Sequence, residues 1–131
     1  MQTKTITLPL PSIDLSPNRR VHWAKKAKQV KIHRNRANWK AMEILKPADR
    51  IESYMLFFFY PDKRRRDDDN YTSRCKSYLD GISDRILQDD SEWHHNGVRR
   101  EIDRENPRVE IRVVLRETKE NPHWNPHEER P

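Results

Sequence analysis

The sequence predicts an α/β protein, a small mixed β-sheet with two main helices attached in the order β-α-β-α-β-β. Four segments show the alternation or the apolar runs of β-strands, and two longer segments between them have apolar residues at helical spacing. A chain of 131 residues also has the size of one domain with a single core. We therefore expect one domain over residues 1–117. A flexible tail is expected over residues 118–131, which contain three prolines and no apolar periodicity.

The first strand is expected over Thr3–Leu10, with Ile6, Leu8 and Leu10 on one face and two threonines on the other. Prolines near its end indicate a sheet edge or the end of a strand, because proline donates no ladder hydrogen bond. The strongest strand signal lies at Ile51–Tyr60, which is apolar on both faces. This pattern is typical of a central strand or of a strand in a dimer interface, and its three phenylalanines are expected in the core.

The first helix is expected from His22 to about Leu45 and ends before Pro47. Its apolar residues recur at spacings of three, four and seven, at Trp23, Ala27, Val30, Ala37, Ala41 and Ile44. Trp23 and Trp39 are interpreted as core or interface residues.

The second helix is expected to begin at Asn70, with Asp69 or Asn70 as its cap. Its buried stripe comprises Tyr71, Cys75, Tyr78, Leu79, Ile82 and Ile86. Gly81 interrupts this pattern at a cost of about 1 kcal/mol relative to alanine. Close packing of a strand against the helix would explain a glycine there.

Two shorter strands are expected over Val98–Glu105 and Arg108–Arg116. Asn106 and Pro107 lie between them and favour a tight antiparallel connection.

The composition indicates a basic protein of the reducing cytoplasm. The formal net charge is +6 and the pI is about 9.6, which favours nucleic acid or another anionic surface as a partner. The single cysteine, Cys75, excludes an intrachain disulfide framework, and no apolar run approaches the roughly 20 residues that span a membrane. The N-terminus lacks the long apolar core of a signal peptide. Because only 33% of the residues are hydrophobic, a second copy of the chain would help to complete the core.

The first helix is strongly basic. No acid occurs between Asp14 and Glu43, yet that stretch has nine cations, namely Arg19, Arg20, Lys25, Lys26, Lys28, Lys31, Arg34, Arg36 and Lys40. Solvated helix faces normally mix charges and gain pairs one turn apart. A contact with the phosphate backbone of DNA is therefore favoured over a merely solvated face.

The segment that follows the central strand concentrates both charge signs. Asp67 and Asp69 are one residue apart, and with Asp90, and Asp89 beside it, they offer the oxygen ligands that Mg²⁺ prefers. Lys76 could offset charge on a phosphate. On spacing alone, surface salt bridges and a helix cap explain the acids equally well. His94 and His95 are interpreted as a loop or DNA-facing pair, since nothing near them completes a zinc site.

Three segments resemble the RusA family of Holliday junction resolvases, which phages and prophages often carry. They are PDKRRRDDDN (61–70), RCKSYLDGI (74–82) and LQDDSEW (87–93). SPNRRVHW (16–23) is also similar to the opening of many phage members, so the resemblance covers most of residues 5–115.

The resemblance implies that Asp67, Asp69 and Asp90 bind Mg²⁺, with Mn²⁺ as a substitute, and that Lys76 assists catalysis. Two positions depart from the family pattern. Asp68 stands where an apolar residue is common, and the lysine comes six residues after Asn70 rather than three, so Arg74 is a reserve candidate. The expected DNA contacts are Lys63, Arg64, Arg65, Arg66, Arg74, Asn18, His22, Lys25, Lys28 and Lys31.

The resemblance also implies the function. We expect a homodimeric, Mg²⁺-dependent endodeoxyribonuclease that resolves four-way DNA junctions by paired symmetric nicks in recombination and repair. Two alternatives stay open, a non-catalytic protein that binds branched DNA and a nuclease for flaps or other branched DNA.

Overall fold

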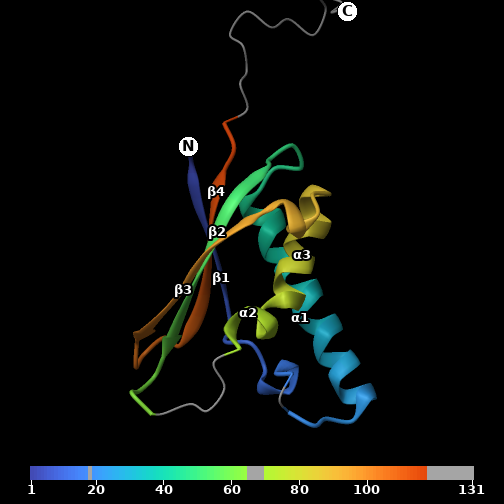
Figure 1. Cartoon of the computed structure of the whole chain (residues 1–131), viewed down its shortest axis with the longest axis vertical. Coiled ribbons are helices and arrows are strands. Elements are labelled where there is room, and N and C mark those ends of the chain that lie inside the picture. Colours follow the sequence, from blue (N-terminus) through green and yellow to red (C-terminus); the bar gives the residue numbers. More distant parts are fainter. Residues whose placement is uncertain (18, 65–69, 118–131) are drawn as a thin grey trace, which may run out of the picture.

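The computed structural model of the chain describes residues 1–17, 19–64 and 70–117 and has the expected mixed α+β architecture (Figure 1). The strands are β1 (Thr3–Leu8), β2 (Ile51–Tyr60), β3 (His94–Ile102) and β4 (Arg108–Leu115). The α-helices are α1 (Trp23–Ile44), α2 (Tyr71–Arg74) and α3 (Lys76–Ile86), and two short 3₁₀ helices are η1 (Ile13–Leu15) and η2 (Asp90–Glu92). The predicted order of strands and main helices is confirmed. The expected tail at 118–131 lies outside the described residues.

The four strands form one sheet in the order β1-β4-β2-β3. β2 lies inside the sheet, antiparallel to β4 and parallel to β3, so its prediction as a central strand is confirmed. The predicted antiparallel pairing of the last two strands is wrong, because β2 lies between β3 and β4. The two helices between β2 and β3 form a crossover, which returns β3 parallel to β2, and the apolar β2 then accepts β4 on its other side.

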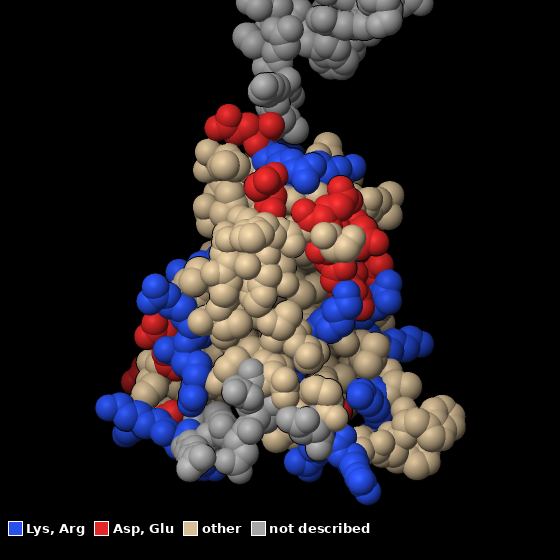
Figure 2. All heavy atoms as spheres, in the orientation of Figure 1, with Lys and Arg blue, Asp and Glu red and all other residues tan. Residues whose placement is uncertain are grey.

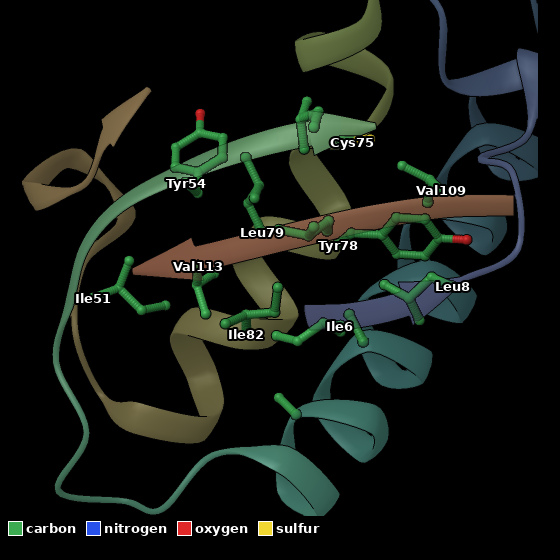
Figure 3. Packing of buried hydrophobic residues seen from close by; sticks show 14 of the residues in the cluster. Ile6, Leu8, Ile51, Tyr54, Cys75, Tyr78, Leu79, Ile82, Val109 and Val113 are labelled. Carbon is green, nitrogen blue, oxygen red and sulfur yellow. The ribbon is translucent and has the colours of Figure 1, made fainter. Parts of the chain in front are cut away.

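The main helices cover one face of the sheet, and the core lies between these two layers (Figures 1 and 3). Alternate residues of the strands point into it, as the period of two requires. The buried set includes Leu56 and Phe58 of β2, Ile111 of β4, and Tyr78 and Ile82 of α3, all completely buried. Burial of such a side chain contributes about 1.5 to 3 kcal/mol.

α1 and α3 approach closely at Gly81. A Cβ added there would collide with the backbone carbonyl of Arg34, and would lie 2.9 Å from Ala37 Cβ and 3.0 Å from the Asn38 amide nitrogen. The sequence correctly predicted a close approach, but the partner is a helix and not a strand.

The second predicted helix is broken at Cys75 into α2 and α3. α3 ends at Leu87, which has left-handed backbone angles (φ 52°, ψ 39°). Beyond it the buried Gln88 side chain both accepts from and donates to the backbone of Ile51, at 2.7 and 3.1 Å. These bonds fix the end of the helical layer to the start of β2.

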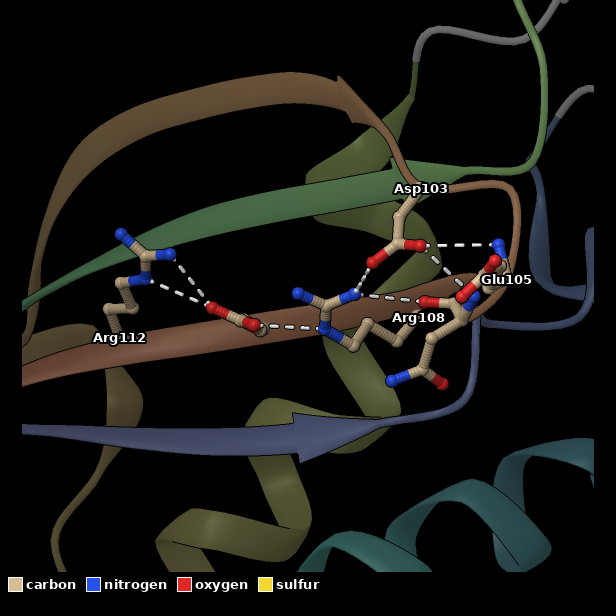
Figure 4. A network of polar contacts seen from close by, with 6 residues as sticks. Asp103, Glu105, Arg108 and Arg112 are labelled. Carbon is tan, nitrogen blue, oxygen red and sulfur yellow. Dashed lines mark hydrogen bonds and ion pairs between the residues drawn. The ribbon is translucent and has the colours of Figure 1, made fainter.

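The outer face of the sheet is covered by charged side chains. The guanidinium groups of Arg108 and Arg112 lie over the rings of Phe59 and Phe57, at 3.8 and 3.7 Å. Glu110 lies between the two arginines and bonds to both (Figure 4). The prediction that all three phenylalanines are core residues is therefore wrong for Phe57 and Phe59, which are half-buried.

The same face carries the connection from β3 to β4. The Asp103 carboxylate accepts the Glu105 and Asn106 amides and pairs with Arg108 at 2.7 Å (Figure 4). Within the described ranges, none of the helices is both long and apolar enough to cross a bilayer.

Candidate active site

Lys76, Asp80 and Asp90 come together at the surface. Lys76 is the first residue of α3 and Asp80 lies one turn later, so the helix places Lys76 Nζ 3.1 Å from Asp80 Oδ1. Asp90 begins η2, and its Oδ2 accepts a hydrogen bond from the same ammonium group. The structure thus joins Lys76 and Asp90, two of the predicted site residues, across 14 positions of sequence.

The pairing fixes the protonation state of Lys76. Its hydrogen bond to Asp90 raises the pKa of Lys76, and Asp80 adds to this effect, although partial desolvation opposes it. The group therefore stays an ammonium at neutral pH. Lys76 can donate hydrogen bonds and neutralise negative charge, but it is unsuited to act as a base.

Aromatic residues support the strand that follows Asp90. The Tyr54 ring of β2 meets Trp93 edge-on at 6.1 Å and stacks on His95 at 4.7 Å. Burial raises the pKa of Tyr54, and the negative charge of Asp90 adds to the shift. Sequence reasoning did not count Tyr54 or Asp80 as site residues. Asp80 had a detectable signal, its spacing of four from Lys76, whereas Tyr54 had none.

Asp89 has a local structural role. Its carboxylate accepts the Ser91 amide at 2.9 Å and caps η2. Hydrogen bonds from Ser91 lower the pKa of Asp89 and keep it ionised. Its proposed contact with a metal stays a prediction.

The remaining predicted ligands, Asp67 and Asp69, lie outside the described residues, as do Asp68, Arg65, Arg66 and Asn18. Asn70 occupies the cap position of α2 without a capping hydrogen bond from its side chain. Over residues 1–17, 19–64 and 70–117, no three His, Cys, Asp or Glu residues gather in a way that could hold a metal.

The described part of the site nevertheless fits a hard cation chemically. Asp80 and Asp90 contribute carboxylate oxygens, the ligand type that Mg²⁺ prefers. Their combined charge already attracts one cation, the ammonium of Lys76. The acids expected at 67 and 69 would add ligands of the same kind.

Basic residues near the end of β2 differ in their exposure. Lys63 and Arg64 are exposed, with Arg64 3.6 Å from the Asp62 carboxylate. Arg74 is buried, and its Nη2 donates to the Pro11 carbonyl at 2.6 Å. This burial argues against Arg74 as a DNA contact or reserve catalytic residue, a role that stays a prediction. Its guanidinium instead holds the segment before η1 against α2.

The start of α1 projects into solvent. Every residue from Trp23 to Lys28 is exposed, so Trp23 is not a core residue of the single chain, and its alternative interpretation as an interface residue stays a prediction. The exposed fraction is 77% for Trp23 and 69% for Trp39. His22 caps the helix by accepting the Ala24 amide through Nδ1 at 3.3 Å.

The cations of this helix are partly paired across elements, which the sequence did not reveal. Arg34 forms a two-pronged pair with Asp84 of α3 at 2.6 and 2.8 Å, and Lys25 lies 3.4 Å from Asp14. Among the described residues, Lys26, Lys28 and Lys31 have no ion-pair partner.

The two charge signs occupy neighbouring parts of one face. Figure 2 shows acidic side chains gathered on the upper part of the helical layer. Basic side chains lie below them, toward the end where α1 begins in Figure 1. A cleft of about 430 Å³ opens beside the site and is lined by Lys76 and Asp80 together with parts of η1, α1 and α2.

The fold and the site define a small mixed α+β protein with a lysine–carboxylate cluster next to a basic surface. The chain matches none of the protein-family models with which it was compared. It is similar to an uncharacterized protein of Xylella fastidiosa (strain Temecula1 / ATCC 700964), with 40% identity over 96 residues, 68% of this chain. The chain spans 61% of that relative's length.

Proposed function

We propose that the protein is a Mg²⁺-dependent endodeoxyribonuclease that resolves four-way DNA junctions, as its resemblance to RusA resolvases implies. The observation that best supports the proposal is the contact between Lys76 and Asp90. These residues bear the expected catalytic roles, are distant in sequence, and meet beside lysines of α1 that form no ion pair with any described residue. A pair that only stabilises the fold does not need a basic surface next to it, so this combination favours a functional site.

Each group has a role that its chemistry fits. Asp67, Asp69 and Asp90 would hold Mg²⁺, which when bound supplies an activated water and stabilisation of negative oxygen. Lys76 keeps its proton and donates hydrogen bonds to the phosphate oxygens, where charge develops during cleavage. Lys63, Arg64 and the α1 lysines bind and orient the DNA backbone.

The protein acts as a homodimer in this proposal. Each chain carries one site, and a four-way junction presents equivalent strands related by a two-fold axis. A two-fold dimer therefore matches its substrate and nicks opposed strands symmetrically.

The test is cleavage of a labelled synthetic four-way junction, with a linear duplex of the same sequence beside it. We expect paired nicks in the junction when Mg²⁺ is present and none when a chelator replaces it. Asp90→Asn removes a ligand and should abolish cutting while junction binding persists. Asp67→Asn should do the same, because it removes a ligand and a repulsive charge.

Asp84→Asn is the matched control, because it makes the same change in an ion pair of α3 that does not involve Lys76. It should leave cutting within about twofold of wild type, as expected for a surface pair. Junction binding without cutting under any divalent metal would refute the nuclease and leave a branched-DNA-binding protein. Equal cutting of flaps and junctions would instead assign a broader branched-DNA nuclease.

A further inference from the structure

The cleft beside the candidate active site has both apolar walls and cationic groups. Leu15, Pro17 and Val30 give it apolar surface. Lys26 and Lys76 contribute positive charge, and Asp80, which pairs with Lys76, contributes one negative charge. Hydroxyl groups from α2 and the start of α3 also line it. Its volume of about 430 Å³ lies in the range of roughly 300 to 1,000 Å³ that is usual for small-ligand sites. A ligand with a flat apolar part and an anionic part suits these walls.

An exposed tryptophan lies on the same side of α1 as this cleft. Trp23, Lys26 and Val30 follow at spacings of three and four, so they share one helix face. Trp23 is 77% exposed at the end of the helix that projects from the body, and its only ring neighbour among the described residues is His22, at 5.6 Å. Single exposed aromatic side chains are common on protein surfaces, but an indole on the helix face that borders the cleft offers a flat apolar surface on which a planar ring can stack.

The surrounding charge selects the kind of partner. Lys26 lines the cleft, and Lys28 and Lys31 continue along the same helix without ion-pair partners in the described part of the chain. Aromatic rings within a basic field are the usual means of binding unpaired nucleotides, because every base has a face on which to stack.

We propose that Trp23 and the cleft bind an unstacked nucleotide of the DNA strand next to the scissile phosphate. The base stacks on Trp23 or enters the cleft between Pro17 and Val30, while Lys26 and Lys76 contact the adjoining phosphates. This inference rests on the proposed DNA substrate and deepens it. It requires DNA binding but not cleavage, so the two proposals can fail separately. Bases at a junction's branch point are the easiest to unstack, which gives the site a preference for branched over linear DNA.

The test uses a four-way junction with 2-aminopurine next to the branch-point base, mixed with protein in chelator so that no strand is cut. The fluorescence of 2-aminopurine rises when the neighbouring base leaves the stack and binds the protein. Wild-type protein should raise it, and Trp23→Ala should abolish the rise. The same variant should weaken binding of a short oligothymidylate by roughly 5- to 100-fold, the usual effect of losing one stacked base. Trp23→Phe should restore most of both signals.

Trp39→Ala is the matched control, since Trp39 is 69% exposed on the same helix but lies on a different face from Trp23 and the cleft residues Lys26 and Val30. Ser73→Phe places a ring at the cleft wall and should reduce the fluorescence rise without touching Trp23. Equal effects of Trp23→Ala and Trp39→Ala would overturn the inference, as would an unchanged fluorescence with wild-type protein. Binding of free dTMP as tightly as the oligonucleotide would also overturn it and assign a small-metabolite site. Failure of the proposed nuclease would appear only in the cleavage assay.

Discussion

Lys76 contacts two carboxylates, which decides what it can contribute to a reaction. Because hydrogen bonding to Asp90 and Asp80 raises the pKa of Lys76, its side chain stays a cation at neutral pH. Phosphodiester cleavage places extra negative charge on phosphate oxygens, and a positioned ammonium stabilises that charge. This role differs from that of a base, which would have to lose its proton first.

Lys76→Met should therefore lower the rate of junction cleavage by roughly 100- to 1,000-fold, the usual effect of removing one such donor. Junction affinity should change by only a few-fold, since the variant removes one phosphate interaction among many. Single-turnover cleavage and a binding titration measure the two effects. Lys40→Met, which alters a lysine paired with Glu43 instead, is the control. A rate that rises with pH in wild type but not in Lys76→Met would show that Lys76 acts as a base.

His33 is a buried residue whose contacts require the neutral ring. Its Nε2 accepts the Ser12 amide at 3.0 Å, its Nδ1 bonds to the Gln29 carbonyl at 2.8 Å, and it stacks on Tyr78. Burial lowers the pKa of His33, opposed by the bond to Gln29 and reinforced by the charges of Arg36 and Arg74. His33 thus holds the segment before η1 in place. Leu15 of η1 in turn lines the cleft.

The pH dependence of stability follows from this shift. The unfolded chain takes up a proton near the ordinary pKa of 6.5, whereas the folded chain resists it to lower pH. The contribution of His33 is therefore complete above about pH 6.5 and is lost as the pH falls from there through the lowered folded-state pKa. Urea unfolding across this window should show the decline in wild type and a smaller one in His33→Leu. The stability of His94→Gln, a change at an exposed histidine, should decline over this pH window as that of wild type does.

Among single residues, the sequence best predicted the positions of those that belong to a recognisable motif. Lys76 and Asp90 were assigned to one site through the resemblance to the RusA family, and in the structure their side chains are in contact. The burial of Arg74 and the exposure of Trp23 were not predicted, because both depend on which neighbouring element lies within reach. Arg74 meets the carbonyl of Pro11, 63 residues away, and α1 extends beyond the layer that would have covered Trp23.

At the scale of elements, the packing of α1 on α3 depends on the absence of a side chain at Gly81. Helix propensity alone predicts that Gly81→Ala stabilises the protein by about 1 kcal/mol. The added Cβ would instead collide with the Arg34 carbonyl, which belongs to backbone and cannot swing away. We expect Gly81→Ala to lower the free energy of unfolding by about 1 to 3 kcal/mol, as overpacking does.

Urea unfolding measures this change, and the sign of the result is decisive. Ala27→Gly at an exposed position of α1 calibrates the propensity effect, which should be a loss of about 1 kcal/mol. If Gly81→Ala instead raised the free energy of unfolding by as much as Ala27→Gly lowers it, the two helices would not meet at Gly81.

Element types and their order were predictable because apolar periodicity records which face each element buries. Strand pairing was not, because β3 and β4 satisfy the local signals of a hairpin although β2 separates them. The position of β2 between β3 and β4 depends on how the whole sheet assembles, and local sequence signals do not record it. The break at Cys75 was also missed, since the apolar spacing of the predicted helix continues unchanged through it.

At the scale of the whole molecule, acidic side chains gather on the upper part of the helical layer, and basic side chains lie below them (Figure 2). The net charge of +6 predicted an anionic partner but not which surface binds it. Pairing across elements removes Arg34 and, in part, Lys25 from the available cations. Lys28 and Lys31 remain on α1, free of ion pairs with the described residues.

Replacing Lys28 and Lys31 together by Ala should therefore weaken junction binding and flatten its salt dependence. Removal of one lysine–phosphate interaction reduces the slope of log K against log salt by about 0.9, so the slope of the double variant should fall by about 1.8. Fluorescence anisotropy at several salt concentrations measures both quantities. Lys40→Ala, at a lysine of the same helix whose charge is paired with Glu43, should leave the slope unchanged. If the double variant kept the wild-type slope, α1 would not be the DNA-binding surface, and the basic residues that follow β2 would have to account for the binding.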